Sequence, residues 1–85
     1  ALIDAGTKVG LDGNLAKTLA IETVLGSAKL LKKSESSPED LRNAVTSPGG
    51  TTEAALNTLS ENDFRALIEA AVLSAKKRSI ELAKN

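Results

Sequence analysis

Hydrophobic residues recur along this chain at the spacing of an amphipathic helix, in segments separated by short polar or glycine-containing breaks. Valine and isoleucine occur singly and never alternate with polar residues over the length of a strand, so no sheet is expected. The pattern therefore predicts an all-α fold, a compact bundle of about five helices. The expected helices are residues 1–9, 13–33, 38–45, 52–59 and 64–83, with a further turn at 60–63.

The boundaries of these segments carry residues that start and stop helices. Gly10 follows the first segment and predicts its end, and Asp12 is placed to cap the start of the second. Ser37 is the expected N-cap of the third helix and Pro38 its first residue. Asp40 would then serve as a short substitute for the glutamate of a capping box.

Two of the expected helices carry more apolar surface than one small domain needs. Between residues 13 and 33 the polar side chains form one narrow strip, and apolar residues cover most of the remaining circumference. Between residues 64 and 83 a second apolar stripe, formed by Ala66, Leu73 and Ile80, lies opposite the main one. Scattered surface residues are one explanation. A subunit or domain interface explains both helices together, and we predict interleaved helical dimerisation.

Composition and charge limit the classes of protein to which the chain can belong. The 85 residues contain 11 Lys+Arg, 11 Asp+Glu, no Cys, no His and one aromatic residue, Phe64. These counts exclude disulfide and zinc-finger frameworks, and they disfavour a nucleic-acid partner, which needs positive charge and stacking surfaces. No segment has the pattern of a membrane span or a signal peptide, and a cytoplasmic location is expected. The chain begins at Ala1 without Met, already in apolar pattern, and it is expected to be a piece of a longer protein.

Only the segment at residues 46–52, Thr-Ser-Pro-Gly-Gly-Thr-Thr, is a candidate for chemistry. Two successive glycines let the backbone approach a ligand, and free N–H groups at the start of the following helix favour an anion. The hydroxyls of Ser47, Thr51 and Thr52 add donors. The segment can therefore form a small nest for a carboxylate or phosphate, although an ordinary capped turn has the same composition. No histidine base, cysteine nucleophile, metal cluster or dinucleotide-binding glycine motif is present.

This heptapeptide resembles the signature loop in the C-terminal helical domain of pyrroline-5-carboxylate reductases. The resemblance continues in collinear order over nearly all 85 residues, through segments 1–6, 10–11, 23–29, 64–65 and 78–82. One departure is Asn62-Asp63, which stands where the family often has two glycines. The larger departure is that the family's N-terminal dinucleotide-binding domain is missing from the chain.

The resemblance implies that residues 1–85 are the C-terminal dimerisation and substrate-binding domain of an enzyme that reduces 1-pyrroline-5-carboxylate to L-proline. The cofactor, NADPH or NADH, would be bound by the missing N-terminal domain, so the isolated chain is expected to be inactive. The implied partner is a second copy in a homodimer, with a ring of dimers as a further assembly. The implied substrate-binding residues are Ser47, Gly50, Thr51 and Thr52, with Thr52 as the hydrogen-bond partner of the ring nitrogen.

Alternatives remain open at this point. The chain could be a non-catalytic helical dimerisation module with an unused loop, or a reductase-like paralogue that acts on another imine or has a regulatory role. A generic helical interaction domain with a chance resemblance is the third alternative.

Overall fold

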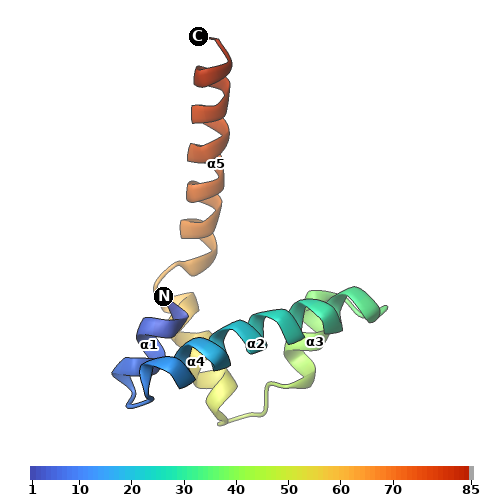
Figure 1. Ribbon diagram of the computed structural model, residues 1–85. Coiled ribbons are helices and arrows are strands. Elements are labelled where there is room, and N and C mark those ends of the chain that lie inside the picture. The colour runs from blue at the N-terminus through green and yellow to red at the C-terminus, as the bar shows by residue number, and fades with distance from the viewer. Residues whose placement is uncertain (85) are drawn as a thin grey trace. The chain divides into compact units, whose positions relative to one another are not determined.

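The computed structural model describes residues 1–84 as five α-helices joined by short connections (Figure 1). No strand occurs in these residues, so the predicted all-α class and the number of helices are confirmed. The helices are α1 (Leu2–Lys8), α2 (Gly13–Lys33), α3 (Pro38–Ala44), α4 (Thr51–Glu61) and α5 (Phe64–Ala83). None of them is long and apolar enough to cross a membrane.

The chain divides into two units, one from Ala1 to Asn43 and one from Ala44 onward. The first unit contains α1 and α2, which contact each other, and the second contains α4 and α5, which contact each other beside the turn that joins them. Packing of all five helices into one bundle, and interleaving with a second subunit, stay predictions.

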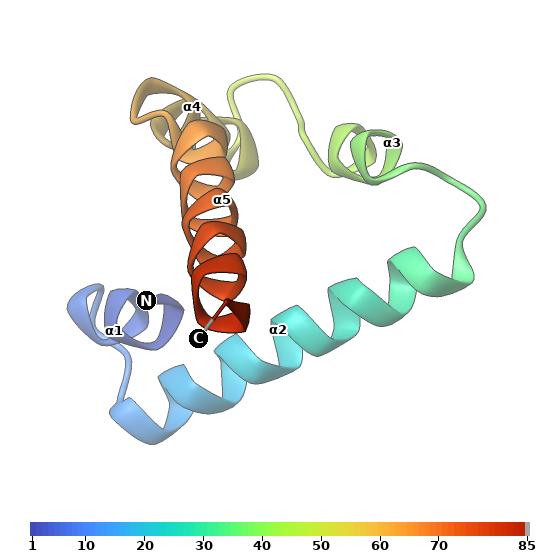
Figure 2. The ribbon, with the colours of Figure 1, turned by 90° about the horizontal axis from the view of Figure 1, so that it is seen from above.

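The connection between α1 and α2 forms as the sequence predicts. Gly10 adopts a φ of 108°, a conformation that disfavours side chains, and the N–H of Leu11 donates to the carbonyl of Gly6 at 3.0 Å. Asp12 then caps α2, because its Oδ2 accepts a hydrogen bond from the N–H of Asn14 at 3.2 Å. The chain reverses direction here, so that α1 lies beside the first turns of α2 (Figure 2).

Close approach of small residues holds α1 against α2. Ala16 is 2% exposed, and it is the one buried hydrophobic residue in the described part of the chain. A Cβ added to Gly6 would lie 3.0 Å from the Cβ of Ala16, which is tighter than ordinary van der Waals contact. Glycine at position 6 therefore allows the two helices to touch.

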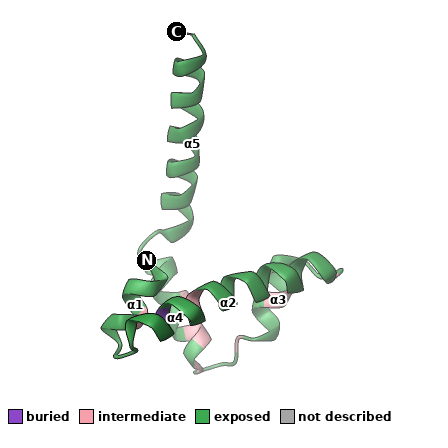
Figure 3. Ribbon diagram, viewed as in Figure 1, coloured by how far each residue is buried: buried purple, intermediate pink, exposed green. Residues whose placement is uncertain are grey.

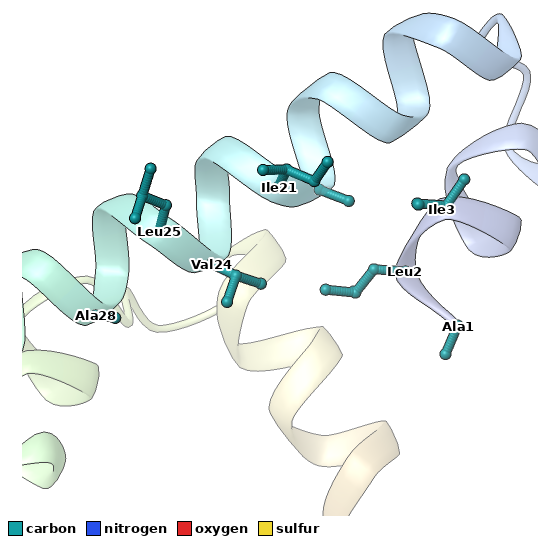
Figure 4. Close-up of a pocket in the computed structure, with 8 residues that line it drawn as sticks. Ala1, Leu2, Ile3, Ile21, Val24, Leu25 and Ala28 are labelled. Atoms are coloured by element: carbon teal, nitrogen blue, oxygen red, sulfur yellow. The ribbon is translucent and has the colours of Figure 1, made fainter.

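Beyond this contact the helices expose their apolar side chains, and the ribbon is coloured exposed over most of its length (Figure 3). Leu2 and Ile3 of α1 line an open groove of about 720 Å³ with Ile21, Val24 and Leu25 of α2 (Figure 4). In the close-up Leu2 and Val24 extend into the same space from the two helices. The lining is almost entirely apolar, so this groove is a surface that water solvates poorly.

The start of α3 also matches its sequence signal. The Oγ of Ser37 accepts a hydrogen bond from the N–H of Asp40 at 3.1 Å, and Pro38 is the first helical residue. Ser37 is thus confirmed as the N-cap, whereas the reciprocal capping role of Asp40 stays a prediction. The helix ends at Ala44, one residue before the expected end.

The turn between α4 and α5 is shorter than predicted. Helix α4 continues through Glu61, and the carbonyl of Thr58 in its last turn accepts both the backbone N–H of Asn62 at 3.2 Å and the side-chain amide of Asn62 at 2.8 Å. Asp63 then adopts a φ of 55° and a ψ of 39°, in the left-handed region. Helix α5 follows with the predicted bounds, Phe64–Ala83, as one continuous rod (Figure 1).

The second apolar stripe of α5 is exposed. Leu73 is 67% exposed and Ile80 is 50% exposed, while Leu67 and Val72 on the main stripe are also exposed at 66% each. No residue of α5 is buried. Both faces of this helix therefore remain available for contacts with other protein surfaces.

Candidate functional site

The glycine-containing segment forms a tight turn directly ahead of α4. The N–H of Gly50 donates to the carbonyl of Ser47 at 2.9 Å and closes a four-residue turn over Pro48 and Gly49. Gly49 has a φ of 73°, in the region where residues other than glycine are strained. Gly50 is extended, and a Cβ at this position would lie 3.1 Å from the carbonyl oxygen of Ser47. The turn thus requires glycine at 49 for its φ and favours glycine at 50 for its space.

The backbone donors at the start of α4 divide into two sets. The N–H of Gly49 donates to the side chain of Glu53, and the N–H of Gly50 donates to the carbonyl of Ser47. The N–H groups of Thr51 and Thr52, in the first turn of the helix, have no acceptor among residues 1–84. Free N–H groups at the start of a helix, together with the positive end of the helix dipole, favour an anion, so these two donors are the candidate anion-binding part of the segment.

The predicted site residues fall within this one short segment. Ser47 and Thr51 are exposed, while Gly50 and Thr52 are half-buried. The structure brings Ser47 and Gly50 together through their hydrogen bond, and it places Thr51 and Thr52 as the first two residues of α4. Gly50 does not offer a free N–H, because Ser47 accepts it, so its contribution is the shape of the turn.

Sequence reasoning missed Glu53. This half-buried residue is the third of α4, and its Oε1 accepts a hydrogen bond from the N–H of Gly49 at 3.1 Å. A glutamate at the third helical position is the signal that could have revealed it, because such residues reach back to backbone N–H groups ahead of a helix. Here the carboxylate reaches one residue further than in a capping box, to Gly49, since Ser47 already accepts the N–H of Gly50.

The described residues do not provide a dinucleotide or metal site. Dinucleotides are bound at the ends of parallel strands by a glycine-rich strand-to-helix turn, and residues 1–84 contain no strand. No group of three or more acidic, histidine or cysteine side chains in this part of the chain is arranged to hold a metal ion. Residues 1–84 therefore contain no strand-based dinucleotide site of this kind.

An all-α chain with one buried hydrophobic side chain and two long exposed helices has the features of a helical association domain. The family model for pyrroline-5-carboxylate reductase dimerisation matches residues 1–82. The chain belongs to this family, which confirms the resemblance found in the sequence.

Relatives of this chain match it over nearly its whole length. It is 48% identical over 83 residues to the pyrroline-5-carboxylate reductase of Pseudomonas aeruginosa, covering 98% of this chain and 30% of that protein. It is 46% identical over 85 residues to the Arabidopsis thaliana reductase, covering 100% of this chain and 31% of the relative. The chain thus spans about a third of the length of these relatives.

Solved structures show the same fold. The chain matches a Plasmodium falciparum pyrroline carboxylate reductase with NADP bound, with a TM-score of 0.89 and 40% identity over 92% of this chain and 32% of that one. It also matches a reductase from Streptococcus pyogenes, with a TM-score of 0.80 and 41% identity over 82% of this chain and 27% of that one.

Proposed function

We propose that this chain is the C-terminal part of an enzyme that reduces 1-pyrroline-5-carboxylate to L-proline in the cytoplasm, and that it binds the substrate's carboxylate. The observation that carries the proposal is the turn at Ser47–Gly50, which leaves the N–H groups of Thr51 and Thr52 without acceptors at a helix start. The full-length relatives are named for this activity, and they support the assignment.

In the proposed complex the substrate's carboxylate accepts hydrogen bonds from the N–H groups of Thr51 and Thr52. Ser47 and Thr51 are exposed, and their hydroxyls would add further hydrogen bonds to the carboxylate. Gly50 has no side chain, so it leaves room for the carboxylate to approach the N–H groups of Thr51 and Thr52. The half-buried Thr52 places its hydroxyl against the ring nitrogen, so that the imine carbon is held in one orientation for reduction.

The redox chemistry requires a second domain. NADPH or NADH would supply the hydride, and the chain offers no fold that holds a dinucleotide in residues 1–84. We therefore assign the cofactor site to an N-terminal domain of the complete reductase. The chain alone is expected to oxidise no NADPH.

We further propose that two copies of the chain associate through their helices and form a homodimer, with a ring of dimers as a further assembly. The family to which the chain belongs is defined by dimerisation. The exposed apolar surfaces of α2 and α5 supply the contact area that such a dimer needs. The groove lined by Leu2 and Val24 would be covered in the same assembly.

Replacement of Thr52 in the complete reductase tests the substrate assignment. Thr52→Ala is expected to lower kcat/KM for pyrroline-5-carboxylate about 5- to 150-fold, which is about 1–3 kcal/mol of transition-state stabilisation, since it removes a hydrogen bond to a charged ligand. Thr52→Ser, which keeps the hydroxyl, should recover most of the loss.

Thr58 provides the matched control for this measurement. Its hydroxyl donates to the carbonyl of Ala54 within α4 at 3.2 Å, away from the start of the helix, so Thr58→Ala should leave kcat/KM unchanged. An unchanged kcat/KM for Thr52→Ala would remove Thr52 from the site.

A further inference from the structure

Glu53 connects the helix to the turn that precedes it. Its Oε1 accepts the N–H of Gly49 at 3.1 Å, across four residues, and the accepting side chain is half-buried. Gly49 is also the residue with a φ of 73°, so the carboxylate holds the point of the turn where the backbone is in the left-handed region. A hydrogen bond from a backbone N–H to an ionised carboxylate is stronger than one between neutral groups.

This bond decides which donors face a ligand. With Gly49 bonded to Glu53 and Gly50 bonded to Ser47, the turn has one hydrogen-bonded shape, and within residues 49–52 the N–H groups without an acceptor are those of Thr51 and Thr52. Without the carboxylate, the N–H of Gly49 loses its acceptor and the turn can rotate about the flexible glycine pair. A ligand would then have to order the turn on binding, which weakens its affinity.

The same carboxylate also brings negative charge to a site that we assign to an anion. Like charges at short range oppose each other, so the charge of Glu53 weakens the binding of a carboxylate while its oxygen orders the turn. The two effects have opposite signs, and they can be separated because glutamine keeps the accepting oxygen and lacks the charge.

We propose that Glu53 is a positioning residue of the substrate loop, which fixes the turn at Gly49 so that the N–H groups of Thr51 and Thr52 meet the substrate's carboxylate. This inference rests on the proposed function, because it takes that loop as the carboxylate site. Glu53 itself does not touch the substrate and acts through Gly49.

Steady-state kinetics of the complete reductase tests the proposal with two substitutions. Glu53→Ala removes the acceptor and is expected to raise KM for pyrroline-5-carboxylate about tenfold with little change in kcat, which corresponds to one lost hydrogen bond. Glu53→Gln keeps the acceptor and should restore KM to the wild-type value or below it, since the repelling charge is gone. A merely structural role would not produce this split between KM and kcat with rescue by the neutral side chain.

Glu39 is the matched control, because it is also an acidic residue in the first turn of a helix, α3. Glu39→Ala should leave KM unchanged. If Glu53→Ala leaves KM unchanged, or if Glu53→Gln raises KM as much as Glu53→Ala does, the proposal is overturned.

The result for Thr52→Ala separates this inference from the proposed function. When Thr52→Ala lowers kcat/KM but Glu53→Ala has no effect, the loop binds substrate and only the role of Glu53 is wrong. When neither substitution has an effect, the loop is not the substrate site and both proposals fail.

Discussion

The two units of this chain are ordered by different kinds of contact. In the first, α1 meets α2 through side-chain packing, with Gly6 against the buried Ala16. In the second, the turn before α4 is ordered by hydrogen bonds from Gly49 and Gly50 to acceptors within the same segment. A close helix contact is disrupted when a larger side chain is introduced. A hydrogen-bonded turn is disrupted when a side chain is added at its positive-φ glycine, and also when one of its hydrogen-bond acceptors is removed. Substitutions in the first unit should therefore change stability, and those in the turn should change ligand binding.

Both units nevertheless share one property, which is exposed apolar surface on a long helix. Leu25 of α2 is 45% exposed and Leu73 of α5 is 67% exposed. Surface of this kind is typical of helices that are covered by another protein chain. Both units are therefore expected to contribute apolar surface to association with another protein chain.

The largest expected effect concerns this association. Leu73→Ser should weaken the dimer about 10- to 100-fold, because burial of one leucine side chain contributes about 1.5–3 kcal/mol. Sedimentation analysis over a concentration series measures the dissociation constant. Lys76→Ser, on the same helix and with the same introduced residue, is the control and should leave the dissociation constant unchanged. A dimer of Leu73→Ser as tight as wild type would show that the second stripe of α5 lies outside the interface.

The next effect tests packing in the first unit. Gly6→Val should lower the free energy of unfolding by about 1–3 kcal/mol, since even the first added carbon would lie 3.0 Å from the Cβ of Ala16. Gly13→Val makes the same change at a glycine that has nothing within 4 Å of an added Cβ, and it should have a much smaller effect. Urea unfolding followed by circular dichroism measures both. Equal losses for the two variants would mean that α1 does not depend on close contact with α2.

Most helix boundaries could be predicted because they are set by local chemistry. Asp12, Ser37 and Pro38 act on groups within three residues of themselves, and α2 and α5 have the predicted bounds. The end of α4 was predicted two residues early, because the prediction took Ser60 as a break and did not foresee the bond from Asn62 to Thr58.

The candidate site was predictable in composition but not in its internal bonds. The glycine pair and the following threonines mark the segment as a candidate anion site in the sequence, although an ordinary capped turn has the same composition. Which N–H groups stay free depends on the acceptors that the turn selects, and the sequence does not show that Gly50 is bonded to Ser47 or that Glu53 reaches Gly49. The close contact of Gly6 with Ala16 was likewise invisible, since it depends on how two helices meet.

The smallest expected effect compares two aspartates that each precede a helix, one in each unit. Asp12 has a φ of −59° and caps α2 through its side chain, whereas Asp63 has a φ of 55° and makes no side-chain cap bond to α5. Asp12→Ala should therefore lower the free energy of unfolding by about 1 kcal/mol, as expected for a lost N-cap. Asp63→Gly should raise it by about 0.5 kcal/mol, because glycine adopts a positive φ without the steric penalty that a side chain incurs.

The gain at Asp63 is small because two terms oppose each other. Relief of backbone strain favours glycine, but the carboxylate of Asp63 also interacts favourably with the positive end of α5, and glycine loses that interaction together with some freedom of the unfolded chain. Raising the salt concentration screens the charge term and leaves the strain term, so the advantage of Asp63→Gly should grow with salt. Thermal unfolding of both variants at low and high salt tests this. A loss of stability for Asp63→Gly at every salt concentration would show that relief of strain at Asp63 is smaller than the loss of backbone entropy that glycine brings.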